Sequence, residues 1–280
     1  MSSVLIIGAS GLLGQALVNS FIGRIENIGA LSRTLFNHQN NSVVAHRVDV
    51  LELDSIEAII KQYDVIINCI GQISNPISEC LSLNTVGVSN IVNSVKKYNK
   101  KLIHISSVSV YGSSSYVDEE SESNPETLYG CMKSFSEFLI KSNLDHFTIL
   151  RVSNLFGNAQ KKGIINYLEK SYTSNTSDIS FNNDGSMKRY YLHVDDLVCM
   201  VNEVLINEIT GTFNIVGSDQ KTIRELVAMF ETKLSYKFNA IYADYLPTEN
   251  IKEVNCDKIK KVIKISNNYN LKSYIQSLRV

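Results

Sequence analysis

The first 150 residues alternate between short apolar runs and longer segments in which apolar residues recur every three or four positions. Val4–Ile7 is an unbroken apolar run, which predicts a strand that is buried on both faces. Leu12–Ile22 follows and predicts a helix. Its residues Leu13, Leu17 and Phe21 share one face, which is the pattern of a helix packed against a core.

The same alternation continues to about residue 151. The predicted strands are Val4–Ile7, Ile28–Leu31, Val43–Val48, Val65–Ile70, Leu102–Ser106 and Phe147–Arg151. The predicted helices are Leu12–Ile22, Ser55–Gln62 with Asp54 as its N-cap, Ser82–Tyr98 and Glu126–Lys141. Strands separated by helices form parallel sheets with right-handed crossovers. The pattern therefore predicts an α/β fold built on a doubly wound, Rossmann-type parallel sheet.

The regular alternation of predicted strands and helices ends at about residue 152. The predicted elements there are a helix at Gly163–Tyr172, a polar loop at Asn175–Lys188, a strand at Tyr191–Val194, a helix from Asp195 to about Asn207, a strand at Phe213–Val216 and a helix at Thr222–Ser235. The last 45 residues are expected to be irregular. Residues 153–280 are thus predicted to form mainly a small C-terminal lobe, with about 189–216 returning to the first domain.

Composition narrows the class of protein. A chain of 280 residues suits one large α/β domain, or one with a small appendage. A net charge of −1 argues against a nucleic-acid partner and an anionic membrane surface. No apolar run reaches 18 residues, and three glycines break the apolar start with no Lys or Arg before Arg24. We therefore expect neither a membrane span nor a signal peptide.

The five cysteines are isolated from one another, and none forms a C-x-x-C pair. The histidines also lack metal-ligand spacing. This pattern predicts no metal site and no disulfide framework. It indicates a reduced, cytoplasmic setting.

Three glycines at positions 8, 11 and 14 follow the first strand and open the first helix. In a dinucleotide-binding turn, Gly8 permits the tight turn, Gly11 admits the pyrophosphate and Gly14 lets the helix pack close to the sheet. The phosphate would lie at the helix N-terminus, where backbone N–H groups and the helix dipole favour an anion. No Walker A pattern is present, so a P-loop NTPase is excluded.

The end of the second strand commonly contacts the adenosine ribose, and an acidic residue there favours NAD. This chain carries Ser32 and Arg33 at that point and no acid. Arg33 can pair with a 2′-phosphate and Ser32 can hydrogen-bond it, which favours NADP over the alternative, NAD. Residues 1–152 are therefore predicted to form an NADP-binding Rossmann domain.

Tyr129 and Lys133 lie one helical turn apart, and Ser107 ends the preceding strand. A neighbouring ammonium is expected to lower the pKa of Tyr129 from its usual value near ~10, so that the phenol serves as an acid or base. Ser107 can hydrogen-bond the substrate oxygen. The predicted catalytic residues are Ser107, Tyr129 and Lys133.

At these residues the chain resembles the extended short-chain dehydrogenase/reductase family, in particular its nucleotide-sugar epimerases and reductases. Ile105–Gly112 resembles the catalytic-serine segment, and Pro125–Lys133 resembles P-x-x-x-Y-G-x-x-K. Asn84 matches the asparagine of the helix after the fourth strand. Arg151–Gly157 resembles R-x-x-N-x-x-G, and Arg189–Asp196 resembles R-D-[FY]-[IL]-H-V-D-D.

The resemblance implies a nucleotide-sugar substrate and a homodimer formed through the helices Ser82–Tyr98 and Glu126–Lys141. The residues implied to bind the cofactor are Gly8, Ser10, Gly11, Leu12, Leu13, Gly14, Ser32, Arg33, Asp49, Val50, Cys69, Ile70, Gly71, Asn84, Tyr129 and Lys133. The residues implied to bind the substrate are Ser107, Ser109, Asn154 and Arg189. Arg189 would contact the diphosphate.

The chain departs from the family pattern at two points. Tyr190 replaces the usual aspartate, and the late arginine that makes a second diphosphate contact has no clear counterpart. Only Arg224 and Arg279 remain downstream, and Lys252 is a candidate substitute.

Val108 follows Ser107, where dehydratases of the family carry an acidic pair and GDP-fucose-forming enzymes a cysteine. Neither of those reactions is therefore expected. The favoured function is an NADP-dependent reductase of a nucleotide-linked keto sugar, with a 4-keto-6-deoxyhexose as the expected substrate. The alternatives are an NAD-dependent nucleotide-sugar 4-epimerase and a non-catalytic NADP-binding sensor or scaffold.

Overall fold

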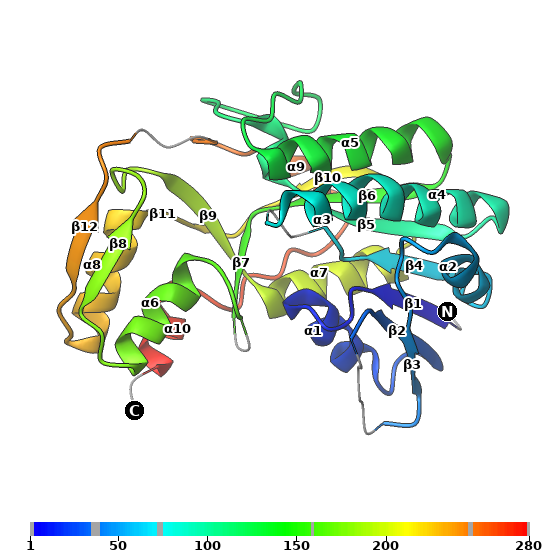
Figure 1. Cartoon of the computed structure of the whole chain (residues 1–280), viewed down its shortest axis with the longest axis horizontal. Helices are drawn as coiled ribbons and strands as arrows, with labels where there is room; N and C mark the ends of the chain where they lie inside the picture. The colour runs from blue at the N-terminus through cyan, green and yellow to red at the C-terminus, as the bar shows by residue number, and fades with distance from the viewer. Residues whose placement is uncertain (1–2, 35–39, 72–74, 158–159, 246–248, 279–280) are drawn as a thin grey trace.

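The computed structural model describes residues 3–34, 40–71, 75–157, 160–245 and 249–278. Figure 1 shows a larger part that holds the N-terminus and a smaller part that holds the C-terminal helix. The strands β7 and β9 run between the two parts.

Seven parallel strands form the central sheet, in the order β10-β6-β5-β4-β1-β2-β3. Their bounds are β1 (Ser3–Ile7), β2 (Asn27–Ser32), β3 (Val43–Arg47), β4 (Val65–Asn68), β5 (Lys101–Ser107), β6 (Phe147–Val152) and β10 (Gly211–Ile215). The predicted doubly wound parallel sheet is confirmed. Because the order reverses between β1 and β4, the crevice at their carboxyl ends is where this class of fold binds ligands.

Helices cover both faces of this sheet (Figure 1). One face carries α1 (Leu12–Phe21) and α7 (Val194–Ile206). The other carries α2 (Leu53–Ile60), α3 (Ile77–Ser82), the π-helical turn η1 (Leu83–Gly87), α4 (Val88–Lys97) and α5 (Leu128–Asn143). The pleat of β1 explains the two layers, since Val4 and Ile6 point into the first layer and Leu5 and Ile7 into the second.

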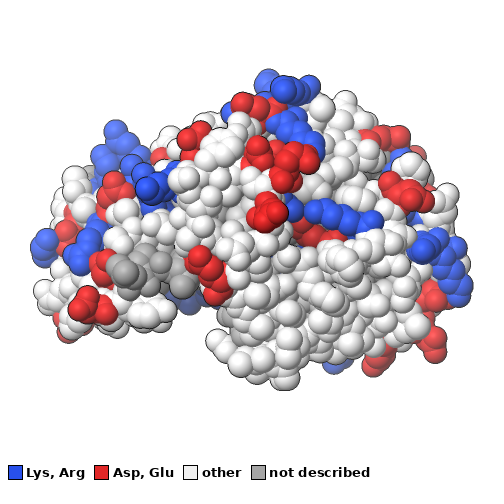
Figure 2. Space-filling view, turned by 90° about the horizontal axis from the view of Figure 1, so that it is seen from above, with Lys and Arg blue, Asp and Glu red and all other residues white. Residues whose placement is uncertain are grey.

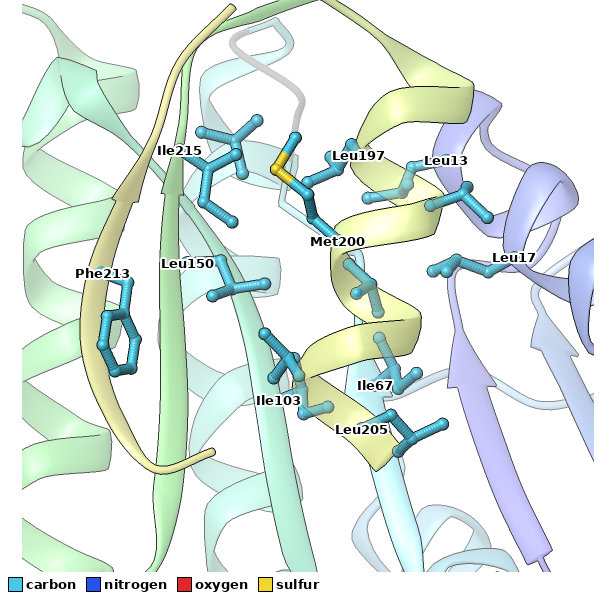
Figure 3. Packing of buried hydrophobic residues seen from close by; sticks show 14 of the residues in the cluster. Leu13, Leu17, Ile67, Ile103, Leu150, Leu197, Met200, Leu205, Phe213 and Ile215 are labelled. Carbon is cyan, nitrogen blue, oxygen red and sulfur yellow. The ribbon is translucent and has the colours of Figure 1, made fainter. Parts of the chain in front are cut away.

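The α1–α7 side holds the larger core (Figure 3). Leu13 and Leu17 of α1 meet Leu197 and Met200 of α7, above inward-facing side chains of the strands. Met200 is 1% exposed. Full burial of each such side chain contributes roughly 1.5–3 kcal/mol, so this layer fixes α1 and the glycine turn that precedes it.

The smaller part has its own core of buried residues and two short sheets. Its elements are β7 (Asn154–Phe156), α6 (Ile164–Thr173), β8 (Asp178–Phe181), β9 (Lys188–His193), β11 (Asp219–Thr222), α8 (Ile223–Leu234), β12 (Asn239–Tyr242) and α10 (Leu271–Ser277). The 3-10 helix η2 (Val108–Tyr111) and α9 (Asp257–Lys260) lie beside the central sheet.

The structure corrects several predicted elements. The predicted polar loop at Asn175–Lys188 contains β8, which pairs with β12 in the supposedly irregular C-terminal region. The predicted helix Ser82–Tyr98 begins at Ile77 and changes to π geometry over η1. Helix α2 begins at Leu53, so Asp54 lies in its first turn instead of capping it.

The segment 189–216 divides between the two parts of the molecule. Helix α7 packs on the central sheet and β10 forms its edge strand. Strand β9 pairs instead with β7 and β11 in the three-stranded sheet.

The face in Figure 2 carries basic and acidic side chains intermixed, beside a broad area without charged residues. No helix among the described residues is both long and apolar enough to cross a membrane.

Candidate active site

A pocket of about 620 Å³ opens at the carboxyl ends of β1, β2 and β4 and reaches the smaller part of the molecule. The residues predicted to bind the cofactor that line it are Gly8, Ser10, Gly11, Leu12, Ser32, Arg33, Val50, Cys69, Ile70 and Gly71. Asn154 and Arg189, which were predicted to bind substrate, line its other end. The pocket thus joins the two predicted subsites.

The glycine turn has the close packing that a dinucleotide-binding turn requires. Gly8 adopts φ +88°. A Cβ on Gly14 would lie 2.2 Å from the Gly8 carbonyl oxygen, so only glycine lets α1 sit this close. Gly11 is the N-cap of α1 and offers no side-chain cap, which leaves the helix N-terminus to face the pocket. These features fit a bound pyrophosphate.

Six predicted cofactor residues do not line the pocket, namely Leu13, Gly14, Asp49, Asn84, Tyr129 and Lys133. Leu13 is buried in the core between α1 and the sheet. Gly14 packs against the Gly8 carbonyl. Asp49 accepts a hydrogen bond from the Leu51 backbone N–H at 3.0 Å. Leu13, Gly14 and Asp49 thus shape the turns that carry the pocket.

Asn84 lies in the π-helical turn and is fully buried. Its amide donates to the Cys80 carbonyl at 2.9 Å and to the Gly71 carbonyl at 3.4 Å. Its Oδ1 is buried without a hydrogen-bond partner. A Cβ on Gly71 would lie 2.2 Å from this oxygen, so Asn84 packs directly beneath the pocket residue Gly71. A buried amide oxygen without a hydrogen-bond partner is uncommon, and this one lies behind Gly71 and outside the pocket lining.

At the ribose end, Arg33 forms an ion pair with Glu79 of α3. The Ser32 hydroxyl donates to the Thr34 carbonyl. No Asp or Glu lines the pocket among the residues that the structure describes. The wall at this end therefore offers a guanidinium and no carboxylate.

The three predicted catalytic residues come from two adjacent elements. Ser107 is the last residue of β5, and its hydroxyl accepts from the Ser109 backbone N–H at 3.2 Å. Tyr129 lies in the first turn of α5, which the Thr127 side chain caps. The Ser107 side chain lies near the Tyr129 phenol and lowers its pKa. Lys133 lies one turn further and is 2% exposed.

The structure contradicts the expectation that Lys133 lowers the pKa of Tyr129. Burial raises that pKa to about 12, and the nearby Ser107 side chain opposes the rise only in part. The Lys133 ammonium is engaged elsewhere, because it donates to the Ile70 carbonyl at 2.8 Å and the Ile105 carbonyl at 3.0 Å. Burial lowers the pKa of Lys133 to about 8. The tyrosine is accordingly a protonated phenol at neutral pH.

A second, much smaller cavity of about 20 Å³ adjoins the pocket and shares Asn154 and Arg189 with it. Ser109 and Glu249 line this cavity. The Ser109 hydroxyl donates to the Glu249 carboxylate at 3.3 Å, and an Arg189 nitrogen lies 3.6 Å from the same carboxylate. Three of the four predicted substrate residues, Ser109, Asn154 and Arg189, therefore line this cavity, whereas Ser107 lies behind Ser109 and lines neither space.

Sequence reasoning missed the lysine pair in the pocket and Glu249 in the small cavity. Lys161 and Lys162 line it from the segment that precedes α6. In the sequence, these two lysines are visible only as a basic pair shortly after the Arg151–Gly157 run. Glu249 had no signal in the sequence, because it belongs to a segment predicted to be irregular.

The remaining candidate chemistry is sparse. Within the described ranges, no group of three His, Cys, Asp or Glu side chains is arranged to hold a metal ion. All five cysteines are free thiols.

Three comparisons place the chain among known proteins. The model of the NAD dependent epimerase/dehydratase family matches residues 4–215. Uronate dehydrogenase of Pseudomonas syringae pv. tomato is 24% identical over 231 residues, which are 79% of this chain and 76% of that protein. Methionine adenosyltransferase 2 subunit beta of Bos taurus is 27% identical over 239 residues, which are 80% of this chain and 69% of that protein.

The fold also matches a solved structure of UDP-glucuronic acid 4-epimerase from Bacillus cereus in complex with UDP-glucuronic acid and NAD. The TM-score is 0.86 over 98% of this chain and 96% of that chain, at 20% sequence identity. A likeness at this identity concerns the fold alone.

Proposed function

The chain belongs to the NAD dependent epimerase/dehydratase family, and from that premise we propose that it transfers hydride between a nicotinamide dinucleotide and a carbonyl or alcohol carbon of a nucleotide-linked sugar. The observation that carries this proposal is the junction of Ser107, Tyr129 and Lys133 at the carboxyl edge of the sheet, beside a pocket that runs from Gly8 to Arg189. Proton transfer and dinucleotide binding then share one site.

The dinucleotide is held by the glycine turn and the ends of the strands. The pyrophosphate is assigned to the N-terminus of α1, because the backbone N–H groups and the helix dipole there favour an anion. Leu31, Val48 and Val50 give the adenine an apolar wall. When bound, the nicotinamide supplies or accepts the hydride.

Tyr129 is the proton donor of the proposed reaction. Because its pKa is raised to about 12, the phenol carries its proton at neutral pH and can donate it to an oxygen that gains negative charge. Ser107 interacts with the same phenol and orients the oxygen that receives the proton. Lys133 lies on the same face of α5, and its ammonium anchors the carboxyl ends of β4 and β5.

The substrate phosphates are assigned to basic residues at the far end of the pocket. Arg189, Lys161 and Lys162 all line it. The two lysines supply positive charge where the resemblance led us to expect a second arginine. Arg224 donates to the Asp184 carbonyl and does not line the pocket. Arg279 lies outside the described residues. Asn154 contacts the sugar from β7.

A net reductase is the favoured reaction. The pocket wall carries Arg33 and no carboxylate among the described residues, which suits the 2′-phosphate of NADP. A protonated tyrosine suits the reductive direction, in which the carbonyl oxygen takes up a proton. A 4-keto-6-deoxyhexose nucleotide is the substrate we propose, because its ketone accepts hydride directly.

A 4-epimerase is the second candidate. It is supported by the family, whose model is named for NAD dependent epimerases and dehydratases, and the fold of the chain is that of a Bacillus cereus UDP-glucuronic acid 4-epimerase whose structure holds NAD. An epimerase returns the hydride to the sugar and consumes no cofactor, so stoichiometry separates the two reactions.

The deciding experiment assays a panel of 4-keto and ordinary nucleotide sugars with NADPH and, separately, with catalytic NAD. Oxidation of NADPH by a 4-keto sugar supports the reductase. Interconversion of two hexoses without net cofactor use supports the epimerase. Tyr129→Phe is the inactive reference in both assays.

A non-catalytic role is the remaining alternative, and the similarity to a protein named as a methionine adenosyltransferase subunit raises it. An intact Tyr129–Lys133 pair argues against it, since a sensor needs no proton donor. Binding of NADPH without turnover on any member of the panel would favour this role over catalysis.

We further propose a homodimer through α4 and α5. Phe138 on α5 is 63% exposed and stacks with Phe135, which is also exposed, at a centroid distance of 6.5 Å. Two adjacent exposed aromatic rings on one helix are typical of an interface.

A further inference from the structure

Glu249 places a carboxylate at the end of the site where proton transfer is proposed. Its Oε1 accepts from the Thr127 hydroxyl, and its Oε2 accepts from the Ser109 hydroxyl at 3.3 Å. A Cβ on Gly130, the neighbour of Tyr129, would lie 3.2 Å from Oε1. The carboxylate therefore rests against the first turn of α5.

A hydrogen bond and backbone pairing hold the Glu249 segment in place. The Glu249 backbone N–H donates to the Glu126 carboxylate at 2.6 Å. The residues that follow pair with 114–117 through the bridges Ser114–Ile251 and Val117–Val254. Glu249 also adopts φ 56°, in the left-handed region that a non-glycine residue rarely takes. Such a conformation persists only where the surroundings impose it, and it is common at ligand sites.

Glu249 also engages the one arginine proposed to bind substrate. Arg189 donates to the Glu249 backbone carbonyl, and a second nitrogen lies 3.6 Å from the carboxylate. The side chains of Arg189 and Glu249 are 16% and 11% exposed. At this depth charges are weakly screened, so an anion at the small cavity meets the repulsion of the Glu249 carboxylate. The diphosphate is assigned to the pocket, which Arg189 also lines and Glu249 does not.

We propose that Glu249 is a specificity-determining residue, which excludes an anionic substituent from the sugar and accepts hydroxyl or ammonium groups in its place. This inference rests on the proposed nucleotide-sugar substrate. A sugar set against Tyr129 and Ser109 meets the Glu249 carboxylate, an acceptor of hydrogen bonds. A hexuronic acid would set a second carboxylate against it.

The first test compares UDP-glucose with UDP-glucuronic acid, which differ in charge only at the sugar. Affinities are measured by calorimetry on protein saturated with NADPH, for the wild type and for Glu249→Gln. The diphosphate is common to both ligands, so its contacts cancel in the ratio. We expect the wild type to bind the uronate about 10–100-fold more weakly, and Glu249→Gln to reduce this ratio to about 3-fold or less. An unchanged ratio, or a wild type that prefers the uronate, overturns the proposal.

The second test needs no sugar nucleotide. Inorganic pyrophosphate is titrated into the same cofactor-saturated proteins. Glu249→Gln should bind it about 10-fold more tightly than the wild type, because Arg189 then lacks a competing carboxylate. The double variant Arg189→Ala with Glu249→Gln should lose the gain. Equal affinity of the wild type and Glu249→Gln overturns the proposal.

The two tests separate this inference from the proposed function. If neither UDP sugar binds and the pyrophosphate gain is present, the assigned substrate class is wrong and the role of Glu249 in excluding anions stands. Glu253→Gln is the matched control, because Glu253 is exposed in the same segment and should change neither result. Glycine readily adopts the left-handed backbone conformation of residue 249, so Glu249→Gly should fold. It should change the uronate ratio and the pyrophosphate affinity as Glu249→Gln does.

Discussion

Arg151 on β6 donates hydrogen bonds from two nitrogens to the carboxylate of Glu137 on α5. Nε lies 3.0 Å from Oε1, and Nη2 lies 2.7 Å from Oε2. Both side chains are 3% exposed. The Ser106 hydroxyl donates to the same carboxylate at 2.6 Å, and Arg151 also donates to the Tyr111 hydroxyl at 2.7 Å. Glu137 lies one turn beyond Lys133, so this pair fixes α5 against the ends of β5 and β6.

Glu137→Gln should strongly destabilise the fold, because it leaves the Arg151 guanidinium buried without its counter-charge. Breaking a buried pair by removing one partner costs roughly 3–5 kcal/mol. Urea unfolding measures the loss. The control is Glu208→Gln, which removes an exposed ion pair with Lys101 and should change the free energy of unfolding little. Equal effects of the two substitutions would refute the role of the Arg151–Glu137 pair.

The same pair predicts how stability depends on pH. Burial raises the pKa of Glu137, but the hydrogen bond and charge of Arg151 outweigh it and lower the pKa below its usual value of 4.5. A carboxylate with a depressed pKa stabilises the fold above the unfolded pKa, and that contribution is lost as pH falls through the folded pKa. The difference in urea midpoint between wild type and Glu137→Gln should therefore shrink below pH 4.5.

Tyr129→Phe removes the transferable proton and keeps the ring. Turnover should fall by ~10²–10⁴-fold, the usual contribution of general acid catalysis, with cofactor affinity nearly unchanged. Steady-state kinetics and cofactor fluorescence measure the two effects. Tyr116→Phe is the control, because Tyr116 is 45% exposed. Retention of more than half the activity by Tyr129→Phe would rule out this tyrosine as the acid.

The pH dependence of turnover should separate Lys133 from Tyr129. Lys133 has its pKa lowered to about 8, so it is charged below pH 8 and loses its proton as pH rises through that value. The pKa of Tyr129 is raised to about 12, so the phenol does not titrate in this range. We expect activity to decline near pH 8 in the wild type. The decline should be absent from the residual activity of Lys133→Met, and its persistence there would assign it to another group.

The proposed dimer can be tested on the exposed face of α5. Light scattering should give the wild type twice the 31.3 kDa chain mass at micromolar concentration. Phe138→Glu should reduce the mass toward that of one chain, because it sets a charge among apolar side chains. Ile206→Glu is the control, since Ile206 is 72% exposed at the end of α7 and should leave the dimer intact. A wild type that is monomeric would contradict the proposal.

The sequence predicted the central sheet because its strands are apolar on both faces. Residues such as Val4 and Leu5 point to opposite sides and are both fully buried, so a continuous apolar run identifies the strand without knowledge of its neighbours. The smaller part lacks this signal. Strands β8 and β12 are short and alternate in burial, and each depends on a partner about 60 residues away.

The residues of the candidate site were likewise predicted where they belong to local motifs, and missed where they depend on pairing between distant parts of the chain. Gly14 and Tyr129 belong to local motifs whose spacing is visible in the chain, and the structure brings their elements to one edge of the sheet. Glu249 reaches that edge only because 251–254 pairs with 114–117. The pKa of Tyr129 was also beyond prediction, since it depends on burial and on where the Lys133 ammonium is held.

We expect cofactor choice to depend on the competition between a 2′-phosphate and Glu79 for Arg33. Arg33 is partly exposed and already paired with Glu79, so binding of NADPH exchanges one anionic partner for another, whereas NADH offers none. We expect NADPH to bind several-fold more tightly than NADH in the wild type. Arg33→Ala should weaken NADPH by about 10-fold, the lower range for a charge-assisted contact, and leave NADH unchanged. Glu79→Gln should strengthen NADPH, because Arg33 then has no carboxylate to leave. Fluorescence titration of both cofactors against the three proteins measures this, and an NADH preference that Arg33→Ala does not alter would favour the NAD-dependent epimerase.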